Sequence, residues 1–396
     1  MQRRIQTALD LPERDTVPIR PLDETDYPGV QTLHRAVGWP ARSLAGWRWL
    51  HSNPARAGID APAGWVVDTG EGELAGHVGN LIQRFHHRGR TLYGATGFSI
   101  IVLPSARGQG QRIIRTFHIQ KGLFARWTFN ANAVSQPLYA RHGMKPWPEQ
   151  THALKLGWPV APLPLIAGKA LKALHRLAPA AVSRLDEQLM NDRLGRAVRL
   201  AVPQGVSLLE DLSDASPYAA FWTALSAEDR LLSDRSPAIL RWRLADPDQT
   251  QTPLLLAVHR DGVMTGYAMA QMAKGNILEP PVLEIVDLEA LAGHADAVPL
   301  LMTALKGAAK QLGAAKLRLP VVSPLQLARL GAFADSARRE GGWGHCHVIF
   351  EDEAAELAWS PTPWDGDQGF CLRPVPLTQD ARVRRPLVAG SSCSKA

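Results

Sequence analysis

Cysteine is scarce in this sequence of 396 residues. Its three cysteines, Cys346, Cys371 and Cys393, are an odd number and lie far apart, without any CxxC spacing. Neither a disulfide framework nor a zinc site is therefore predicted. We expect no bound metal, and a reducing compartment suits the chain.

Long apolar runs are also lacking. No stretch approaches the roughly 20 apolar residues that a membrane-spanning helix needs, and the basic N-terminus has no apolar segment behind it. We therefore expect a cytoplasmic protein. The net charge of +7 suits anionic small molecules, nucleic acid and anionic membranes equally well. Zinc-finger spacing and RNA-binding aromatic patterns are missing, so nucleic acid is not an expected partner.

The chain contains an internal repeat. Residues 42–54 align without gaps with residues 235–247, sharing an Arg-Ser pair, an Arg-Trp pair and a final Pro. Residues 135–143 align in the same way with residues 323–331. The length predicts two domains, and the repeat predicts that they are two copies of one unit.

Each copy predicts the same series of elements. A strand and a helix come first, a strand hairpin follows at 64–78 and at 254–268, and a strand-helix-strand-helix stretch ends the copy. The fold class predicted is α/β (α+β): two tandem domains, each a mixed, mostly antiparallel sheet flanked by helices. The predicted boundaries are an N-terminal extension at 1–16, a first copy at 17–157, a basic amphipathic linker at 158–203, a second copy at 204–352, and a C-terminal segment and tail at 353–396.

The linker has a distinctive charge pattern, because residues 150–185 contain no Asp or Glu but several Lys and Arg. Helical spacing over 165–177 puts apolar residues on one side and basic residues on the other. The apolar set is Ala167, Ala170, Leu171, Leu174 and Leu177, and the basic set is Lys169, Lys172 and Arg176. Two interpretations stay open: a helix on an anionic membrane surface, or a linker helix packed across both domains.

The sharpest local signal follows the apolar strand at 98–102. Pro104 and a glycine-rich turn at 107–112 come next, and helical spacing resumes at Ile113. Such a turn directs unpaired N–H groups and the positive end of a helix dipole at one spot, which favours a phosphate or pyrophosphate. The dinucleotide fingerprint does not fit, because Ile113 stands where the third glycine belongs, and no Walker A motif is present.

This region resembles a known family. Residues 102–110, Val-Leu-Pro-Ser-Ala-Arg-Gly-Gln-Gly, resemble the pyrophosphate-binding segment of the GNAT acyltransferase superfamily, a strand and Pro followed by Arg/Gln-x-x-Gly-x-Gly/Ala. Residues 132–144, with Asn132, Tyr139 and Gly143, resemble the later segment of that superfamily. The resemblance covers about 17–150, and it reaches the second copy only through the repeat.

The resemblance implies an acyl-CoA-dependent acyltransferase. The strand ending near Val102 would separate from the next strand, near 127–129, and the pantetheine arm would lie in the gap. Tyr139 would be the general acid that protonates the leaving thiolate, and Asn132 would hydrogen-bond the pantetheine or a water. Arg112 departs from the usual Gly or Ala, and would either crowd the phosphates or contact them. The acyl-CoA-binding residues implied are Ile101, Val102, Leu103, Arg107, Gly108, Gln109, Gly110, Gln111, Arg112 and Asn132.

The second copy lacks these features. Leu327, which cannot donate a proton, stands in place of Tyr139. Residues 287–296 have one glycine and three acids where the phosphate loop would lie, and these acids would repel a pyrophosphate. We therefore expect the second copy to bind no CoA and to serve as a scaffold, a dimer contact or a wall of the acceptor site.

The sequence does not single out a general base or an acceptor pocket. Candidate bases are His77, His86, His87, His118, His142 and Glu149. Four tryptophans would either fill the core or line a pocket, namely Trp47, Trp49, Trp65 and Trp127.

The leading hypothesis is an N-acyltransferase that uses acetyl-CoA or another acyl-CoA. Its acceptor would be an amine on a small metabolite, amino sugar or peptide. The alternative is a non-catalytic acyl-CoA-binding or cell-envelope assembly protein with a GNAT scaffold. Acyl chain length and oligomeric state are not predicted.

Overall fold

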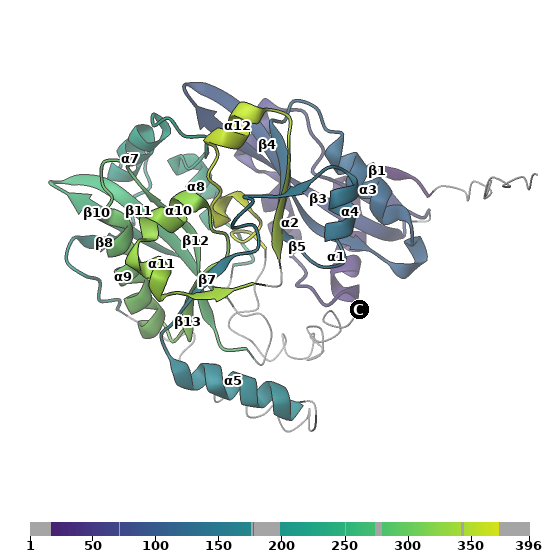
Figure 1. The fold of residues 1–396 in the computed structure, drawn as a ribbon. Coiled ribbons are helices and arrows are strands. Elements are labelled where there is room, and N and C mark those ends of the chain that lie inside the picture. The colour runs from purple at the N-terminus through teal and green to yellow at the C-terminus, as the bar shows by residue number, and fades with distance from the viewer. Residues whose placement is uncertain are drawn as a thin grey trace, which may run out of the picture.

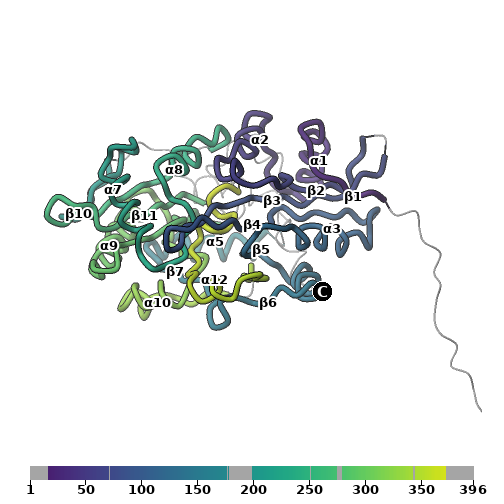
Figure 2. The backbone as a smooth tube through the Cα atoms, turned by 90° about the horizontal axis from the view of Figure 1, so that it is seen from above, coloured from purple at the N-terminus to yellow at the C-terminus, as the bar shows by residue number. Residues whose placement is uncertain are grey.

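A computed structural model describes residues 17–70, 72–175, 177, 199–249, 251–273, 279–341 and 344–371. Two mixed sheets lie side by side, with helices on their faces, as Figures 1 and 2 show. This arrangement confirms the predicted fold class. The predicted N-terminal extension at 1–16, most of the linker and the tail beyond residue 371 lie outside the described residues.

The first sheet holds most strands of the first copy. Its pairs are antiparallel except for β4 with β5. The strands follow the order β1 (Ile19–Pro21), β2 (Gly64–Asp68), β3 (Leu74–His87), β4 (Arg90–Val102), β5 (Ala125–Ala131), β15 (His345–Phe350) and β6 (Lys145–Pro146), and β9 (Leu232–Ser233) pairs with β3.

The second sheet repeats this pattern, with β12 and β13 as its parallel pair. Its strands follow the order β14 (Arg338–Glu340), β7 (Lys155–Pro159), β13 (Lys316–Leu319), β12 (Val282–Ala290), β11 (Val263–Ala273), β10 (Leu254–Arg260) and β8 (Val206–Leu208).

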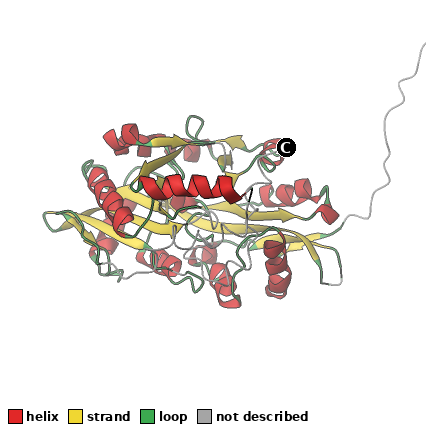
Figure 3. Cartoon of the chain, turned by 90° about the horizontal axis from the view of Figure 1, so that it is seen from below, coloured by secondary structure: helices red, strands yellow, loops and turns green. Residues whose placement is uncertain are grey.

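Helices lie on both sides of the strand layer (Figure 3). In the first copy they are α1 (Tyr27–Ala36), α2 (Leu44–His51), α3 (Gln109–His118) and α4 (Gln136–Arg141). In the second copy and after it they are α7 (Pro217–Ser226), α8 (Pro237–Leu244), α9 (Ala297–Gln311), α10 (Pro324–Leu330), α11 (Ala332–Ser336) and α12 (Glu353–Ala358).

The two copies exchange their last strands. β7 follows the first copy in the chain, yet it pairs antiparallel with β13 and β14 in the second sheet. β15 ends the second copy, yet it pairs antiparallel with β5 and β6 in the first sheet. The copies therefore cannot separate without breaking sheet hydrogen bonds, which makes them one cooperative unit.

Equivalent residues of the repeat meet where the copies join. The Trp49 and Trp242 rings are stacked with their centroids 4.9 Å apart. Each indole N–H donates to the backbone carbonyl of the other residue, at 2.7 Å from Trp49 and 3.1 Å from Trp242. This reciprocal contact marks an approximate two-fold relation between the copies.

The segment after α12 is buried between the copies, where Figure 2 shows it in yellow. A short 3₁₀ helix, η4 (Pro363–Asp365), is capped by the Thr362 hydroxyl. Trp364 and Phe370 are buried, and the Asp365 carbonyl accepts hydrogen bonds from the side chains of Gln83 and Trp127. The described part of the predicted C-terminal segment, up to residue 371, therefore belongs to the core.

Helix α5 (Pro162–His175) follows β7 and lies at the periphery of the second sheet (Figure 1). Among its fourteen residues only Gly168 and Leu171 are buried, so it does not pack across both copies, as one interpretation of the linker expected. Among the described residues, none of the helices is long and apolar enough to cross a membrane.

Candidate functional site

The glycine-rich turn joins the end of β4 to the start of α3. A single turn of 3₁₀ helix, η3 (Pro104–Ala106), follows the strand. Gly108 is the N-cap of α3 and has a φ of 100°, a conformation that L side chains rarely adopt. Ile113 and Phe117 then anchor α3 in the core below the turn. The local fold therefore matches the strand-turn-helix that the sequence predicted.

The amide groups of this turn point to an anion. No side chain caps α3, so the N–H groups of its first residues, Gln109, Gly110 and Gln111, have no partner within the helix. The positive end of the helix dipole lies at the same place. A Cβ on Gly110 would lie 3.6 Å from its nearest neighbour, Leu138 Cδ1. No other part of the chain therefore crowds the turn at Gly110. These groups fit a phosphate or pyrophosphate.

Two arginines flank the turn in different ways. Arg107 is exposed, so its positive charge is open to an anion. Arg112 Nη1 donates to the Val17 carbonyl at 3.0 Å and to Gln109 Oε1 at 2.6 Å. The side chain of Arg112, the residue that departs from the family pattern, is thus hydrogen-bonded to other residues of the chain.

Beyond the turn, a gap opens in the first sheet. β4 and β5 pair in parallel from Gly94 to Thr96 of β4, and the last pair is Thr96 with Trp127. β4 then continues to Val102 and β5 to Ala131 without further pairs between them. The strands separate where the resemblance implied, and the backbone groups of β4 that face β5 can hydrogen-bond an extended ligand.

The three predicted binding residues at the end of β4 lie along this gap. Ile101 is buried, and Val102 and Leu103 are half-buried. The Leu103 N–H donates to the Ala75 carbonyl on the β3 side. The end of β4 is therefore fixed on one edge, and its other edge faces the gap.

Tyr139 lies beside the first unpaired residue of β5. Its side chain is buried, and it hydrogen-bonds Thr128, which directly follows the last residue paired with β4. Burial raises the pKa of the Tyr139 phenol well above its usual value, the Thr128 hydrogen bond opposes the shift, and the charge of Asp367 adds to it. The phenol is therefore protonated at neutral pH and can act as a proton donor.

Asn132 shapes the entry into α4. Its side-chain oxygen accepts from the N–H groups of Val134 and Ser135, both at 3.0 Å. Its own N–H donates to the Ser135 hydroxyl at 3.0 Å. The oxygen is thus committed to the turn, so any contact of Asn132 with a ligand would be made by its amide nitrogen.

The structure adds a carboxylate that the sequence did not indicate. Asp367, from the segment after η4, accepts a hydrogen bond from the side chain of Asn130 on β5. Cys371 Sγ lies 3.3 Å from its other oxygen. Its negative charge acts on Tyr139 and also on buried Cys346, whose pKa burial raises to about 12. A half-buried carboxylate is thus placed at the gap, close to the predicted general acid.

Of the histidines named from the sequence, His118 lies beside Tyr139, with their ring centroids 6.4 Å apart. Burial lowers the pKa of His77 to about 3 and that of His118 to about 4. His86 and His87 face acids of the second copy, with Nε2 of His86 3.5 Å from Asp234 and Nε2 of His87 3.2 Å from Asp229.

The last two candidate bases lie near α4 or in the open. The His142 ring centroid is 5.6 Å from that of His118, and Glu149 is exposed. Asp367 is therefore the carboxylate that the structure favours at the gap. All four tryptophans that the sequence singled out are buried, which confirms the core interpretation.

In the second copy, the equivalent strand β12 carries buried ion pairs. β12 pairs with β13 only from Val282 to Glu284, but the side chains beyond are buried in ion pairs. Asp287 accepts from the Arg235 guanidinium, and Glu289 from Arg230 and Arg329. These contacts support the expectation that the second copy binds no CoA.

The acid at the start of α9 is also paired. Asp296 is the N-cap residue of α9 and hydrogen-bonds Arg260, at 3.0 Å from its Nε. Leu327, the counterpart of Tyr139, packs against the apolar core of the second copy. A negative charge thus stands at the helix N-terminus where the first copy presents glycines and arginines.

We expect Asp287→Asn to destabilise the protein by about 3–5 kcal/mol, because the buried Arg235 guanidinium loses the carboxylate that hydrogen-bonds it and keeps only the more distant Asp365 and Glu289, at 3.8 and 3.9 Å. Asp287 and Arg235 are both almost completely buried. Chemical denaturation measures the change. Asp229→Asn, which removes an exposed ion pair with Arg88, is the control and should change stability little. Equal stability of the two variants would contradict this account of the second copy.

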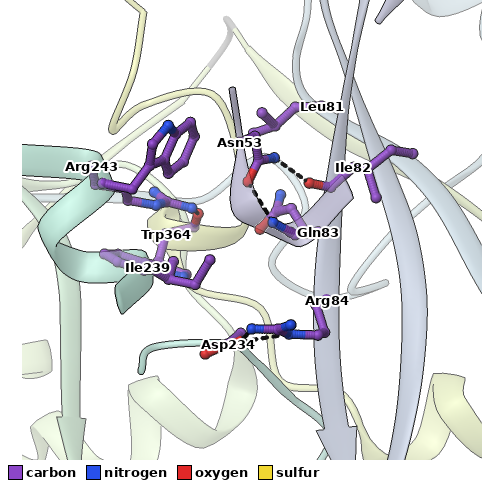
Figure 4. A pocket seen from close by; sticks show the side chains of 11 residues that line it. Asn53, Leu81, Ile82, Gln83, Arg84, Asp234, Ile239, Arg243 and Trp364 are labelled. Carbon is purple, nitrogen blue, oxygen red and sulfur yellow. Dashed lines mark hydrogen bonds and ion pairs between the residues drawn. The ribbon is translucent and has the colours of Figure 1, made fainter. Parts of the chain in front are cut away.

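A small cavity lies between the copies, next to the buried C-terminal segment (Figure 4). Arg243 lies over the Trp364 ring at 3.6 Å, and burial lowers its pKa to about 10. The free space is about that of one water molecule, so it is too small for an acyl acceptor. The lining residues are Asn53, Ala55, Leu81, Ile82, Gln83, Arg84, Asp234, Ile239, Trp242, Arg243 and Trp364.

Two of the three cysteines lie within the described residues. Cys346 is buried and Cys371 is half-buried, and Cys393 lies outside the described residues. Within the described part of the chain, no cluster of His, Cys, Asp and Glu could hold a metal ion.

Comparison of the sequence with protein-family models and with curated proteins finds no match. Solved structures do match. A probable N-acyltransferase from Enterococcus faecalis superposes with a TM-score of 0.50 at 12% identity, covering 84% of this chain and 72% of that one.

Two further structures show the same likeness. N-myristoyltransferase from Saccharomyces cerevisiae, solved with bound myristoyl-CoA and inhibitors, gives a TM-score of 0.50 at 10% identity, over 87% of this chain and 81% of that one. A GCN5-related N-acetyltransferase from Kribbella flavida gives a TM-score of 0.47 at 17% identity, over 85% and 72% of the two chains. The likeness to the two structures with a TM-score of 0.50 spans both copies and is one of fold, that of two tandem GNAT-like domains.

Proposed function

We propose that this chain, which has the tandem GNAT fold, is an acyl-CoA-dependent N-acyltransferase with its working site in the first copy. The carrying observation is the gap between β4 and β5, which opens after the Thr96–Trp127 pair and leads to the free amides of the turn at Gly108. The yeast N-myristoyltransferase of similar fold binds myristoyl-CoA. An acyl-CoA fits both features, because its extended arm with the thioester would lie in the gap and its pyrophosphate would bind the amides of the turn.

Binding would use backbone groups more than side chains. The N–H groups of Gln109, Gly110 and Gln111 would hold the pyrophosphate, and Arg107 would add positive charge. The β4 edge at 97–102 would hydrogen-bond the pantetheine arm in the place of a neighbouring strand. Tyr139 lies at the deep end of the gap, beside Thr128.

Transfer of the acyl group requires two proton movements. The amine nitrogen attacks the thioester carbonyl, the carbon–nitrogen bond forms and the carbon–sulfur bond breaks. Tyr139 gives its phenolic proton to the departing thiolate. Asp367 would take the proton that the amine loses; its hydrogen bond from Asn130 on β5 and the effect of its charge on Tyr139 support this role.

The acceptor would enter beside the C-terminal segment. Phe129 of β5 lies next to Gly366 on this segment, since a Cβ on Gly366 would be 2.8 Å from its ring. Phe98 of β4 packs against Phe370, with centroids 5.1 Å apart. This side of the gap is built by the first copy and by the C-terminal segment that follows the second copy, so that segment would shape the acceptor site. The acceptor proposed is an amine on a small metabolite, amino sugar or peptide.

The test is release of free CoA from acetyl-CoA and longer acyl-CoAs in the presence of a panel of amines. Thiol titration follows the release, and mass spectrometry identifies the amide. Amine-dependent release with an amide product supports the proposal. Tight binding of acyl-CoA without turnover of any amine would favour the non-catalytic alternative instead.

We expect Asp367→Asn to lower kcat at neutral pH by about 100- to 1,000-fold, because the amine then loses its general base. Acyl-CoA affinity should stay the same, since Asp367 lies away from the turn that holds the pyrophosphate. The loss should shrink as the pH approaches about 10, where a free amine gives up its proton to solvent. Steady-state kinetics from neutral to alkaline pH measure all three effects.

Glu149→Gln is the matched control for this prediction. Glu149 is an exposed carboxylate of the first copy, and its variant should keep full activity across the same pH range. Equal kcat for Asp367→Asn and the wild type would show that Asp367 is not the general base. That result would not contradict the proposed acyl-CoA site.

A further inference from the structure

Helix α5 carries an apolar stripe on its outer side. Exposed fractions are 76% for Leu163, 63% for Ile166 and 40% for Leu174 on the helix, and 84% for Leu177, two residues beyond its end. Exposed Ala170 lies between Ile166 and Leu174, and the spacing of three or four residues puts Leu163, Ile166, Ala170 and Leu174 on one face of the helix. Soluble proteins rarely expose a row of this kind without a partner.

The inner side of the helix is already used. Gly168 and Leu171 are buried against the protein, and Lys172 Nζ pairs with Glu279. The apolar stripe therefore faces away from the protein, while the opposite side of α5 holds the helix against it. Figure 1 shows α5 at the lower edge of the molecule, apart from both sheets.

The charge around the stripe selects its partner. Residues 150–185 contain no Asp or Glu, and exposed Lys169 lies between the outer stripe and the inner side of α5. Leu and Ile on one face with Lys beside them match the boundary between lipid headgroups and acyl chains, where lysine reaches toward phosphate. Helix α5 itself has no acid that anionic headgroups would repel, and Glu279, which lies against it, is paired with Lys172.

We propose that α5 is a peripheral docking surface for an anionic phospholipid bilayer. The apolar stripe enters the headgroup boundary, and Lys169 meets the lipid phosphates. This surface is separate from the turn at Gly108 and does not depend on the proposed acyltransferase function. It concerns where the protein works and not which reaction it performs.

Co-sedimentation with vesicles tests the proposal. The probes are phosphatidylcholine vesicles with about 30% phosphatidylglycerol and vesicles of phosphatidylcholine alone. We expect the full-length protein to pellet with the anionic vesicles and to bind the neutral ones about 10-fold more weakly. The triple variant Leu163→Ser, Ile166→Ser, Leu177→Ser should lose at least about 10-fold in binding to the anionic vesicles.

The matched control is the triple variant Ile119→Ser, Val263→Ser, Leu357→Ser. These residues are exposed by 66%, 60% and 90% and lie outside α5, so this variant should pellet like the wild type. Circular dichroism and thermal unfolding check that both variants fold.

Three outcomes would overturn the proposal. The wild type fails to pellet with anionic vesicles, or both triple variants pellet equally, or the wild type is a dimer in lipid-free solution that the α5 variant dissociates. The last result would assign the stripe to a second copy of the chain. Acyl-CoA turnover is measured separately, so failure of one proposal does not imply failure of the other.

Discussion

Gly110→Glu should weaken acyl-CoA binding by at least about 100-fold, which is about 2.7 kcal/mol. Gly110 is in the first turn of α3, among the amides that would hold the pyrophosphate. A carboxylate there meets a doubly charged group of the same sign at close range, where solvent screens poorly. It also reverses the charge preference of the helix N-terminus. Isothermal titration calorimetry with acetyl-CoA measures the change.

Two variants at the same position separate charge from bulk. Gly110→Ala should bind nearly as well as the wild type, because its Cβ would make only ordinary contacts with Leu138 and Val102. Gly110→Gln has the size of the glutamate without its charge, and it should bind more tightly than Gly110→Glu. Wild-type affinity in Gly110→Glu would show that the pyrophosphate lies elsewhere.

Tyr139→Phe should lower kcat by about 10- to 1,000-fold with little change in acyl-CoA affinity. The ring keeps its place in the core of the first copy, and the substitution removes only the proton donor and the hydrogen bond with Thr128. Loss of one such hydrogen bond costs about 1 kcal/mol of stability, so the variant should remain folded.

Tyr93→Phe is the control for this prediction. Tyr93 lies on β4 before the strands separate and is half-buried, so its hydroxyl has no place in the transfer. Single-turnover kinetics with saturating acyl-CoA compare the two variants directly. A fully active Tyr139→Phe enzyme would mean that another group protonates the thiolate.

Local structure in the first copy was predictable because short-range patterns determine it. The run of apolar residues before Pro104 predicted the end of β4, and glycine at 108 predicted a turn that only a positive φ completes. Ile113 and Phe117 predicted the buried face of α3. The repeat predicted the tandem fold, and the Trp49–Trp242 contact shows why both copies keep that tryptophan.

The exchange of β7 and β15 was not predictable from such patterns. A strand of five or six residues shows which side chains are buried, but it does not name its neighbour. Both strands lie at the ends of the copies, where either sheet could accept them. The predicted boundaries at 157 and 352 divide the chain by sequence. The strands at these boundaries, however, form their hydrogen bonds with the sheet of the other copy.

Asp367 was missed for a related reason. It is far from Tyr139 in the chain and follows no motif, and its position depends on how the segment after η4 packs between the copies. A signal was present in the aromatic residues around it, because Trp359, Trp364 and Phe370 are too apolar for a solvated tail. These residues predict burial of the segment but not the partner of its carboxylate.

The second copy keeps the fold without the features proposed to bind acyl-CoA. Where the first copy has a protonated tyrosine beside the unpaired part of β5, the second has the buried carboxylates Asp287 and Glu289 on β12, each paired with arginine. The second copy then serves the first by supplying β15, and the segment that follows it carries Asp367.

The stoichiometry of acyl-CoA binding tests the central claim most directly. Calorimetric titration of the full-length protein with acetyl-CoA and with longer acyl-CoAs gives both the affinity and the number of sites. The account predicts one site per chain, which Gly110→Glu removes and Asp287→Asn leaves intact. Two sites per chain, or no binding of any acyl-CoA, would contradict it.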